Sequence, residues 1–593
     1  MDREAEREIR GRIETVSGPT VVASGMVGAR MHTTCLVGEA GLLGEIILVS
    51  GERATIQVYE DTTGLRLGEE VVSLSQPLLA RLGPGLLSRV FDGVERPLEA
   101  LEAVFGPFIG RGCGAEPLDP DRTWGFEPRK ARGERVAPGD VLGVVRETEA
   151  VEHRVLVPPG MSGVVREIRS GAVTGREPLC TLEGGGEIGL YQEWPVRVPR
   201  PSAGELAPSE PLITGQRVFD TLLPVARGGT AAVPGGFGTG KTVVEQTLAR
   251  FAKVDIVVYI GCGERGNEIT DILTEFPELR DPETGLSLSE RTVLIVNTSN
   301  MPVAAREASI FTGITIAEYY RDMGYHVALM ADSISRWAEA LREISSRLEE
   351  MPGEEGYPPY LATRLGRFYE RAGVVRCLGD GGRTGSVTVI SAVSPPGGDF
   401  SEPVTQASLR FAGTLWALDR DLAHRRHFPA ISVEGSFSLY YDELADWYTD
   451  NVSPELDGLR ARFLSLLQRE MELKEVMQII GMEGLQEKDR LVIEGAALAR
   501  EVFLRQSAYD EVDAFCTPQK QFWMLKAIMS YLDAMEAALS RGEYLESLLE
   551  NPIRAKLVTM HSVPNEGFAD FCRRLIDELE VHFAQKRGEE GGR

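Results

Sequence analysis

The sequence predicts a multidomain protein with an N-terminal β-barrel, an inserted β-rich module, a central α/β domain and a C-terminal α-helical bundle. Three observations support this prediction. A chain of 593 residues is too long for a single hydrophobic core. Short β-type segments with Gly-containing turns come first, and apolar runs that alternate with helical patterns follow. Long stretches with apolar residues at helical spacing come last.

The N-terminal region, residues 1–80, contains alternating apolar and polar stretches at 20–23, 45–49 and 53–58. Gly-containing turns separate these stretches, and this spacing indicates a small β-barrel. We expect a connector at residues 81–109 between the barrel and the next region.

A second β-rich region covers residues 110–195 and is rich in Gly and Pro. Its strand candidates lie at 141–145 and 152–157. A Pro-Pro-Gly turn at 158–160 and three successive glycines at 184–186 punctuate it. We therefore interpret this region as an inserted module.

The central region, residues 196–440, alternates apolar runs with helical patterns, which is typical of βα units around a mostly parallel sheet. Its predicted buried strands lie at 255–260, 292–296, 326–331 and 386–390. In residues 441–593 Gly and Pro become rarer, and stretches such as 456–480 and 491–505 place apolar residues at helical spacing. This last region is predicted to be a helical domain.

Residues 235–242 match the phosphate-binding pattern G-x-x-x-x-G-K-[ST] in its expected context, between a predicted strand at 230–233 and a predicted helix at 243–250. In such a loop, backbone N–H groups and a helix N-terminus face phosphate oxygens. Lys241 is predicted to neutralise charge on the β- and γ-phosphates, and the Thr242 hydroxyl to ligate Mg²⁺. The candidate nucleotide-binding residues here are Gly235, Gly236, Phe237, Gly238, Thr239, Gly240, Lys241, Thr242 and Val243.

Two carboxylates follow predicted strands of the same sheet. Asp332 comes directly after the strand at 326–331, where a second acidic group usually holds magnesium through water. Glu264 lies in the segment 261–268 and is our candidate for orienting or deprotonating the attacking water. Arg265 is placed to meet a phosphate or to hold Glu264. The alternatives are a helix cap for Asp332 and a solvated loop pair for Glu264 and Arg265.

Composition limits the class of protein. A formal net charge of −26 argues against nucleic-acid binding, which requires basic surface. The sequence contains no apolar run long enough to span a bilayer, and its charged start lacks the apolar core of a signal peptide. The 7 cysteines have no metal-binding spacing, so we expect free thiols and no structural zinc. A cytoplasmic location is expected.

The motifs together resemble the catalytic A subunit of V-type (archaeal and bacterial A/V-type) rotary ATPases. The resemblance covers essentially the whole chain, including the barrel and the module at 110–195, an insertion that distinguishes these subunits from the β subunits of F-type synthases. It implies that the central domain is a RecA-like α/β P-loop nucleotide-binding domain. The segments that carry it are 92–98, 235–242, 261–268, 330–337, 351–358 and 394–400.

The resemblance also implies roles for matching residues. Lys241 and Thr242 hold phosphate and Mg²⁺, and Asp332 belongs to the metal shell. Glu264 activates the water, while Arg265 lies by the phosphates. The other implied site residues are Arg336, which lines the same site, and Phe428, Ala508 and Tyr509 at the adenine pocket. For the two aromatic residues the alternative is ordinary core packing.

An assembly is implied as well. Three copies alternate with three B subunits, each of which supplies an arginine to the site, and ATP hydrolysis or synthesis is coupled to a central rotor shaft. Peripheral stalk subunits and a membrane sector that moves H⁺ or Na⁺ complete the complex, on the inner face of the cell membrane. ATP or ADP and Mg²⁺ are the expected cofactors. The segment 481–490 occupies the place of the lever that pushes on the shaft, with a solvated helix-turn as the alternative.

This chain departs from family patterns at two places. Position 239 is Thr, where eukaryotic vacuolar relatives carry Cys, so silencing through a disulfide at the loop is not expected. Residues 432–434 are Ser-Val-Glu, where relatives usually have Asn-Trp. The resemblance therefore does not predict which residues form the edge of the adenine pocket.

Three rival functions remain to be compared. An RNA-translocating hexameric ATPase would need a basic, base-stacking surface, which the acidic composition disfavours. A secretion-system or flagellar export ATPase normally lacks the module at 110–195. A non-catalytic regulatory protein would bind nucleotide without turnover, and the intact set Lys241, Thr242, Glu264 and Asp332 argues against it.

Overall fold

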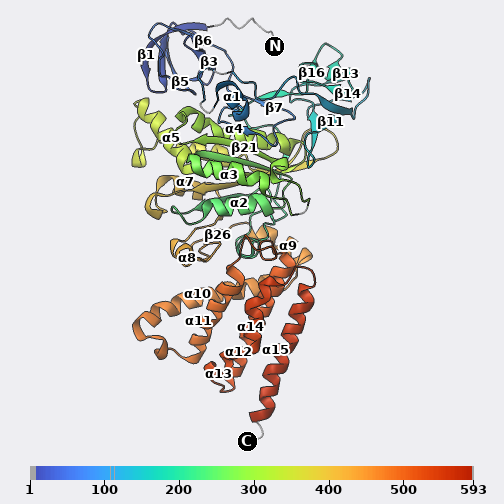
Figure 1. Ribbon diagram of the computed structural model, residues 1–593, viewed down its shortest axis with the longest axis vertical. Helices are drawn as coiled ribbons and strands as arrows, with labels where there is room; N and C mark the ends of the chain where they lie inside the picture. The colour runs from blue at the N-terminus through green and yellow to red at the C-terminus, as the bar shows by residue number, and fades with distance from the viewer. Residues whose placement is uncertain (1–8, 107–108, 113, 283, 591–593) are drawn as a thin grey trace. The chain divides into compact units, whose positions relative to one another are not determined.

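The computed structural model describes residues 9–106, 109–112, 114–282 and 284–590. The chain forms two compact units, and Figure 1 colours the ribbon by residue number from blue to red. Unit 1 comprises the chain up to Ala207 together with Arg227–Ala232 and Val254–Ala412. Unit 2 comprises Pro208–Ala226, Val233–Lys253 and the chain from Gly413 onward. The phosphate loop therefore belongs to unit 2, whereas Glu264 and Asp332 belong to unit 1.

Unit 1 begins with a closed barrel in the strand order β1-β2-β5-β4-β3-β6. Its inward-facing side chains, such as Val21, Ile46 and Ile56, are fully buried, while neighbouring positions along the strands are more exposed. The predicted barrel is confirmed. Its strands are β1 Ile9–Ser17, β2 Thr20–Ser24, β3 Thr34–Val37, β4 Leu42–Ser50, β5 Arg53–Val58 and β6 Glu70–Ser73.

The inserted module consists of two four-stranded sheets around a core of its own, which includes Trp124, Phe126 and Val155. The buried Glu147 beside it accepts hydrogen bonds from the backbone N–H groups of Gly85 and Leu87. The strands are β9 Trp124–Pro128, β10 Arg135–Val136, β11 Val141–Arg146, β12 Glu152–Leu156, β13 Gly163–Ile168, β14 Gly171–Val173, β15 Cys180–Leu182 and β16 Glu187–Ile188.

A mostly parallel sheet forms the centre of unit 1, in the order β19-β24-β22-β20-β21-β8. The helix α4 (Val303–Asp322) is buried along almost its whole length and packs on β20, β21, β22 and β24, as Figure 1 shows for β21. The strands are β8 Val90–Phe91, β19 Thr230–Pro234, β20 Ile256–Glu264, β21 Thr292–Thr298, β22 His326–Asp332 and β24 Thr384–Val393. The remaining elements are β7 Leu79–Leu82, α1 Leu98–Phe105, β17 Gln192–Pro195, β18 Gly204–Leu206, α3 Gly266–Glu278, α5 Ile334–Arg347, α6 Leu361–Tyr369, β23 Gly373–Arg376 and α7 Pro403–Phe411.

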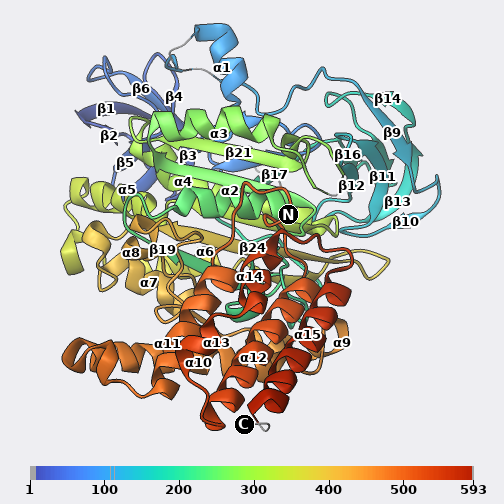
Figure 2. The ribbon, with the colours of Figure 1, turned by 60° about the horizontal axis from the view of Figure 1, so that its bottom comes forward.

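Unit 2 is mainly helical. Its long helices α10, α12 and α15 lie side by side, with α11 against α10 (Figure 2). The predicted helical domain is confirmed, except that the helix expected at 491–505 ends at Ala499 and a π-helical turn, Arg500–Leu504, follows. The elements are α2 Lys241–Phe251, β25 Thr414–Leu415, α8 Arg420–His424, β26 Phe437–Ser438, α9 Tyr441–Asn451, α10 Leu456–Ile480, α11 Glu487–Ala499, α12 Pro518–Ser540, α13 Leu545–Leu549, α14 Pro552–Thr559 and α15 Phe568–Glu590.

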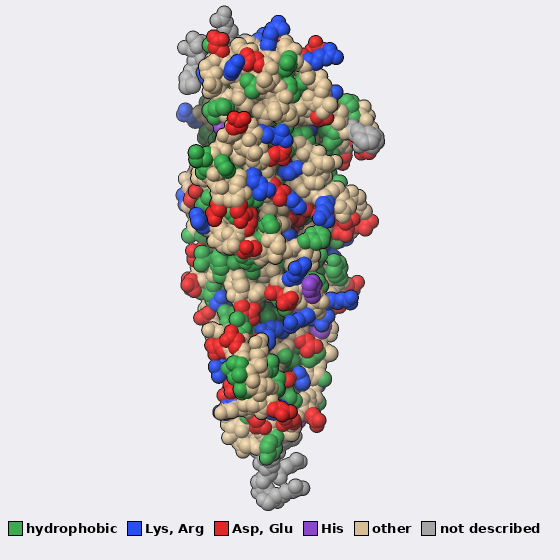
Figure 3. Space-filling view, turned by 90° about the vertical axis from the view of Figure 1, so that its left-hand side faces the viewer, with side chains coloured by type: hydrophobic (Ala, Val, Ile, Leu, Met, Phe, Trp, Pro, Cys, Tyr) green, Lys and Arg blue, Asp and Glu red, His purple; other side chains and the backbone are tan. Residues whose placement is uncertain are grey.

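On the face drawn in Figure 3, acidic and basic side chains are interspersed. Within the described ranges, none of the helices combines the length and low charge that a membrane span needs. The cysteines at 35, 180, 262, 377, 516 and 572 are free thiols and buried, and Cys113 lies outside the described residues.

A buried ion cluster joins the barrel to α4 within unit 1. Arg197 donates to Glu307 at 2.6 and 3.0 Å and to Glu45 of β4 at 3.1 Å. Burial alone would raise the pKa of both carboxyls, but the Arg197 guanidinium beside them lowers the pKa of each below its usual value.

Arg197→Ala is expected to destabilise unit 1 by about 3 kcal/mol, because it removes the guanidinium that pairs with both Glu45 and Glu307, while Glu307 retains its ion pair with Arg364. Urea unfolding, monitored by tryptophan fluorescence, measures the change in the free energy of unfolding. The control is Arg169→Ala, which removes an exposed ion pair with Glu177 and should cost about 1 kcal/mol or less. An equal loss of unfolding free energy in the two variants would contradict a stabilising role of the buried Arg197 pairs.

Candidate active site

The phosphate loop lies in unit 2 between β19 and α2, as the sequence pattern predicts. Gly238 and Gly240 adopt φ values of 78° and 94°, a left-handed region that favours glycine. Lys241 is the first residue of α2, and its Nζ donates to the Gly235 carbonyl oxygen at 2.8 Å. The loop thus places a cation and the N-terminus of an 11-residue helix at one point.

Next to this loop lies a cavity of about 320 Å³, whose lining lies entirely in unit 2. Gly240 and Val243 form the wall shared with the phosphate loop, and Phe428, Ala508 and Tyr509 line the cavity too. A Cβ built on Gly240 would lie 3.6 Å from Cε1 of Phe428, so the ring packs directly on the loop. The Phe428 side chain is 41% exposed and that of Tyr509 84%, which leaves both rings open for stacking rather than committed to the core.

The two predicted carboxylates lie at the carboxyl ends of neighbouring parallel strands in unit 1. Glu264 is the last residue of β20 and Asp332 the last of β22, whose register pairs Gly261 with Asp332. Asp332 is buried, and the Tyr259 hydroxyl donates to its Oδ2 at 3.4 Å. Both carboxyls therefore occupy the sheet edge where ligands bind in α/β folds.

The position of Glu264 corrects one prediction. The sequence predicts a strand that ends at 260 and is followed by a loop, but β20 continues to Glu264 and α3 begins at Gly266. The additional residues pair in parallel with β21, with Cys262 opposite Asn297 and Glu264 opposite Thr298. The carboxylate is consequently held by the sheet.

Burial is the main cause that raises the pKa of Glu264, to about 9, and the nearby carboxyls of Asp332 and Glu268 raise it further. Arg336 acts in the opposite direction but does not compensate. A divalent cation beside Asp332 would favour the charged form of the Glu264 carboxyl. The corner is thus electrostatically suited to a cation.

Both predicted arginines lie at the same corner of unit 1. Arg265 is exposed and precedes α3 directly. Arg336 of α5 pairs with Glu339 at 2.9 Å. A Cβ at Gly263, whose φ is 74°, would meet Cβ of Arg336 at 2.6 Å, so glycine permits this close approach.

Sequence reasoning missed three features of the site. Glu268, on the first turn of α3, interacts with Glu264; its spacing of four residues from Glu264 was an available signal. Arg426 and Gln506 line the cavity in unit 2, and no local pattern marked them.

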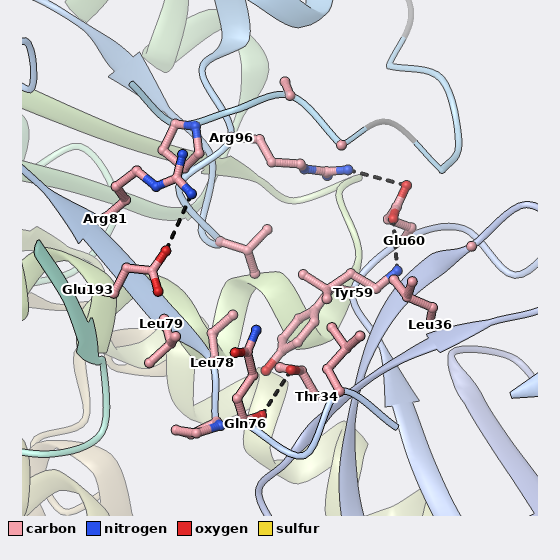
Figure 4. Close-up of a pocket in the computed structure, with 18 of the residues that line it drawn as sticks. Thr34, Leu36, Tyr59, Glu60, Gln76, Leu78, Leu79, Arg81, Arg96 and Glu193 are labelled. Atoms are coloured by element: carbon pink, nitrogen blue, oxygen red, sulfur yellow. Dashed lines mark hydrogen bonds and ion pairs between the residues drawn. The ribbon is translucent and has the colours of Figure 1, made fainter. Parts of the chain in front are cut away.

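A second cavity, of about 290 Å³, lies against the barrel in unit 1 (Figure 4). Its charged lining residues are already paired, Arg81 with Glu193 at 3.3 Å and Arg96 with Glu60 at 3.2 Å. None of the predicted site residues lines it.

Comparisons with known proteins extend over nearly the whole chain. It is 57% identical to the A subunit of an A-type ATP synthase of Methanospirillum hungatei, over 96% of this chain and 97% of that protein. It is 57% identical to the V-type ATP synthase alpha chain of Anaeromyxobacter dehalogenans, over 98% of this chain and 100% of that protein. The chain belongs to the A-subunit family of A/V-type ATP synthases.

Family models match four segments of this A-subunit chain. They are the ATP synthase alpha/beta family beta-barrel domain at residues 13–75, the alpha/beta subunit barrel-sandwich domain at 115–197, the alpha/beta family nucleotide-binding domain at 215–438, and the C-terminal domain of V and A type ATP synthase at 445–549. The predicted identity as a catalytic A subunit, with a nucleotide-binding ATP hydrolase or synthase domain, is confirmed.

Solved structures that share the fold include one from a bacterial secretion system. It is the assembled ATPase of the type III secretion system of enteropathogenic E. coli, with a TM-score of 0.64 and 22% identity over 87% of this chain and 99% of that chain. At this identity the likeness concerns the fold alone. The A-subunit relatives, at more than twice that identity, decide between the two classes of ATPase.

Proposed function

We propose that this A subunit holds the ATP triphosphate on residues 235–242 and its adenine between Phe428 and Tyr509, while Glu264 activates the attacking water. The contiguity of the phosphate loop with the aromatic cavity carries this proposal, because Gly240 belongs to both and Val243, which follows the loop directly, also lines the cavity. A nucleotide bound there would have its base and its phosphates on one continuous surface of unit 2.

The reaction is an in-line attack of water on the γ-phosphorus, in which catalysis comes from positioning and charge. Lys241 binds the β- and γ-phosphates, and Arg265 and Arg336 stabilise the negative charge of the transition state. Glu264 accepts the proton of the water, and the same groups serve synthesis in the reverse direction.

Thr242 and Asp332 would hold Mg²⁺. Their hydroxyl and carboxylate oxygens are ligands that Mg²⁺ prefers, and the carboxyls of Glu264 and Asp332 lie close enough to interact, which favours a cation beside them. The ion would supply neutralisation of phosphate charge and, through it, a fixed orientation of the γ-phosphate.

We further propose the assembly implied by the family: three copies that alternate with three B subunits, a central shaft, peripheral stalks and a membrane sector that moves H⁺ or Na⁺. The chain would then be cytoplasmic, on the inner face of the cell membrane. The end of α10 supports contact with a shaft at 481–490, because Ile479 and Ile480 are 85% and 50% exposed. The domain boundaries proposed are 1–80, 81–109, 110–195, 196–440 and 441–593.

Lys241→Ala tests nucleotide binding on the isolated full chain. Removing a charged hydrogen-bond partner of the phosphates is expected to weaken ATP binding by roughly 10- to 100-fold. Isothermal titration calorimetry measures the affinity. Lys474→Ala on α10 is the matched control and should bind as the unmodified chain does, because its half-exposed side chain pairs with Glu470, a buried carboxylate that keeps its ion pair with Arg500. Unchanged affinity in Lys241→Ala would contradict the proposed phosphate site.

A further inference from the structure

A buried cluster of three polar residues adjoins the aromatic cavity in unit 2, and one of them, Gln506, lines the cavity. Arg217, Gln506 and Asp513 have relative exposures of 0%, 3% and 3%. They come from segments almost 300 residues apart, yet they share a continuous set of hydrogen bonds. We call this set the 217–506–513 cluster.

Arg217 fixes the loop that carries Ala508 and Tyr509. Its Nε donates to the Phe503 carbonyl oxygen at 2.8 Å, and Nη2 to that of Arg505 at 2.6 Å. Its guanidinium also pairs with the Asp513 carboxylate, which accepts the Ser507 N–H at 2.9 Å. The loop is therefore tied to one guanidinium on both sides of Tyr509.

Gln506 joins the two walls that carry the aromatic rings. Its backbone N–H donates to the Phe428 carbonyl oxygen at 2.8 Å, and its Oε1 accepts the Arg217 N–H at 2.7 Å. Its Nε2 donates to the carbonyl oxygens of Gly215 at 2.8 Å and Asp513 at 2.7 Å. Because both amide N–H groups and the carbonyl are engaged within the protein, the side chain sets the shape of the cavity and does not recognise a base edge.

We propose that the 217–506–513 cluster positions the walls of the base cavity in advance, so that it controls affinity for the adenine part of the nucleotide and not for the phosphates. This inference rests on the proposed function, which places adenine in that cavity. A preformed cavity avoids the cost of ordering its walls on binding, and a small misplacement of such walls is costly. Arg217 and Gln506 are thus positioning residues that act through Phe428 and Tyr509.

The test compares ATP with inorganic tripolyphosphate as ligands of the full chain. Gln506→Met keeps the side-chain volume but removes its hydrogen bonds, and Arg217→Lys keeps the charge but loses the forked donor geometry. Each is expected to weaken ATP binding about 10- to 100-fold, with tripolyphosphate affinity within about 2-fold of the unmodified chain. Binding is measured by calorimetry below the unfolding midpoint of each variant.

Gln519→Met is the matched control, because Gln519 donates one exposed hydrogen bond to the Asn451 carbonyl oxygen. It should change neither affinity. In the assembled complex, the two cluster variants should raise the KM for ATP and leave kcat at saturation unchanged, whereas general destabilisation would lower kcat.

The outcomes separate this inference from the function on which it rests. Equal losses of ATP and tripolyphosphate affinity, or no loss of either, would overturn the role of the cluster. If the unmodified chain binds ATP no more tightly than tripolyphosphate, the base cavity itself is wrong and the proposed function fails at that point.

Discussion

Addition of B subunits is expected to raise ATP turnover by this chain by about 10³- to 10⁵-fold, the contribution of an arginine supplied in trans. In the transition state, negative charge spreads over three γ-phosphate oxygens, and Arg265 and Arg336 are the arginines of unit 1 proposed to meet it. Arg336 already pairs with Glu339 at 2.9 Å. In the proposed assembly, an arginine of the neighbouring B subunit would add to the positive charge at the site.

The measurement is steady-state phosphate release by the isolated chain and by the reconstituted complex, at saturating ATP. Calorimetry on the isolated chain should show that nucleotide already binds without the partner. A complex reconstituted with a B subunit that lacks its site-facing arginine serves as the control and should stay near the rate of the isolated chain. Full turnover by the isolated chain would contradict a shared site.

Glu264→Gln is expected to slow hydrolysis in the assembled complex by about 10²- to 10⁴-fold while ATP still binds. Glutamine keeps the size and hydrogen-bonding shape of the side chain but cannot accept the proton of the water. The loss should therefore appear in kcat, with little change in nucleotide affinity.

Glu278→Gln provides the matched control, since Glu278 is an exposed residue at the far end of α3. It makes the same chemical change away from the sheet edge and should leave turnover unchanged. Turnover of Glu264→Gln at the rate of the unmodified complex would remove Glu264 from the chemistry.

Local patterns were sufficient to predict most of the fold. The helix expected at 456–480 has those bounds in the structure, because its apolar residues keep helical spacing up to Gly481, which takes a φ of 74°. The barrel strands β2 and β5 likewise follow the alternation of apolar and polar residues.

The sequence-based prediction of strand length was wrong where pairing between neighbouring strands overrides local composition. Gly261, Cys262 and Gly263 suggested a loop, yet Gly261 pairs with both β21 and β22 and Cys262 with β21. After an irregularity at Gly263 the strand continues to Glu264. The candidate site residues at 235–242, 264 and 332 could be proposed from the sequence because they stand in motifs or directly after predicted strands. The 217–506–513 cluster could not, because its hydrogen bond from Arg217 to Gln506 spans 289 residues and no periodicity reports contacts of that range.

The most direct test of the central claim is the distance between the Glu264 carboxyl and the γ-phosphorus in the assembled complex with a non-hydrolysable ATP analogue. An electron cryomicroscopy structure should place them within about 6 Å, with one water between them and Lys241 on the phosphates. A Glu264 side chain directed away from the γ-phosphate, with no water in line, would contradict the mechanism.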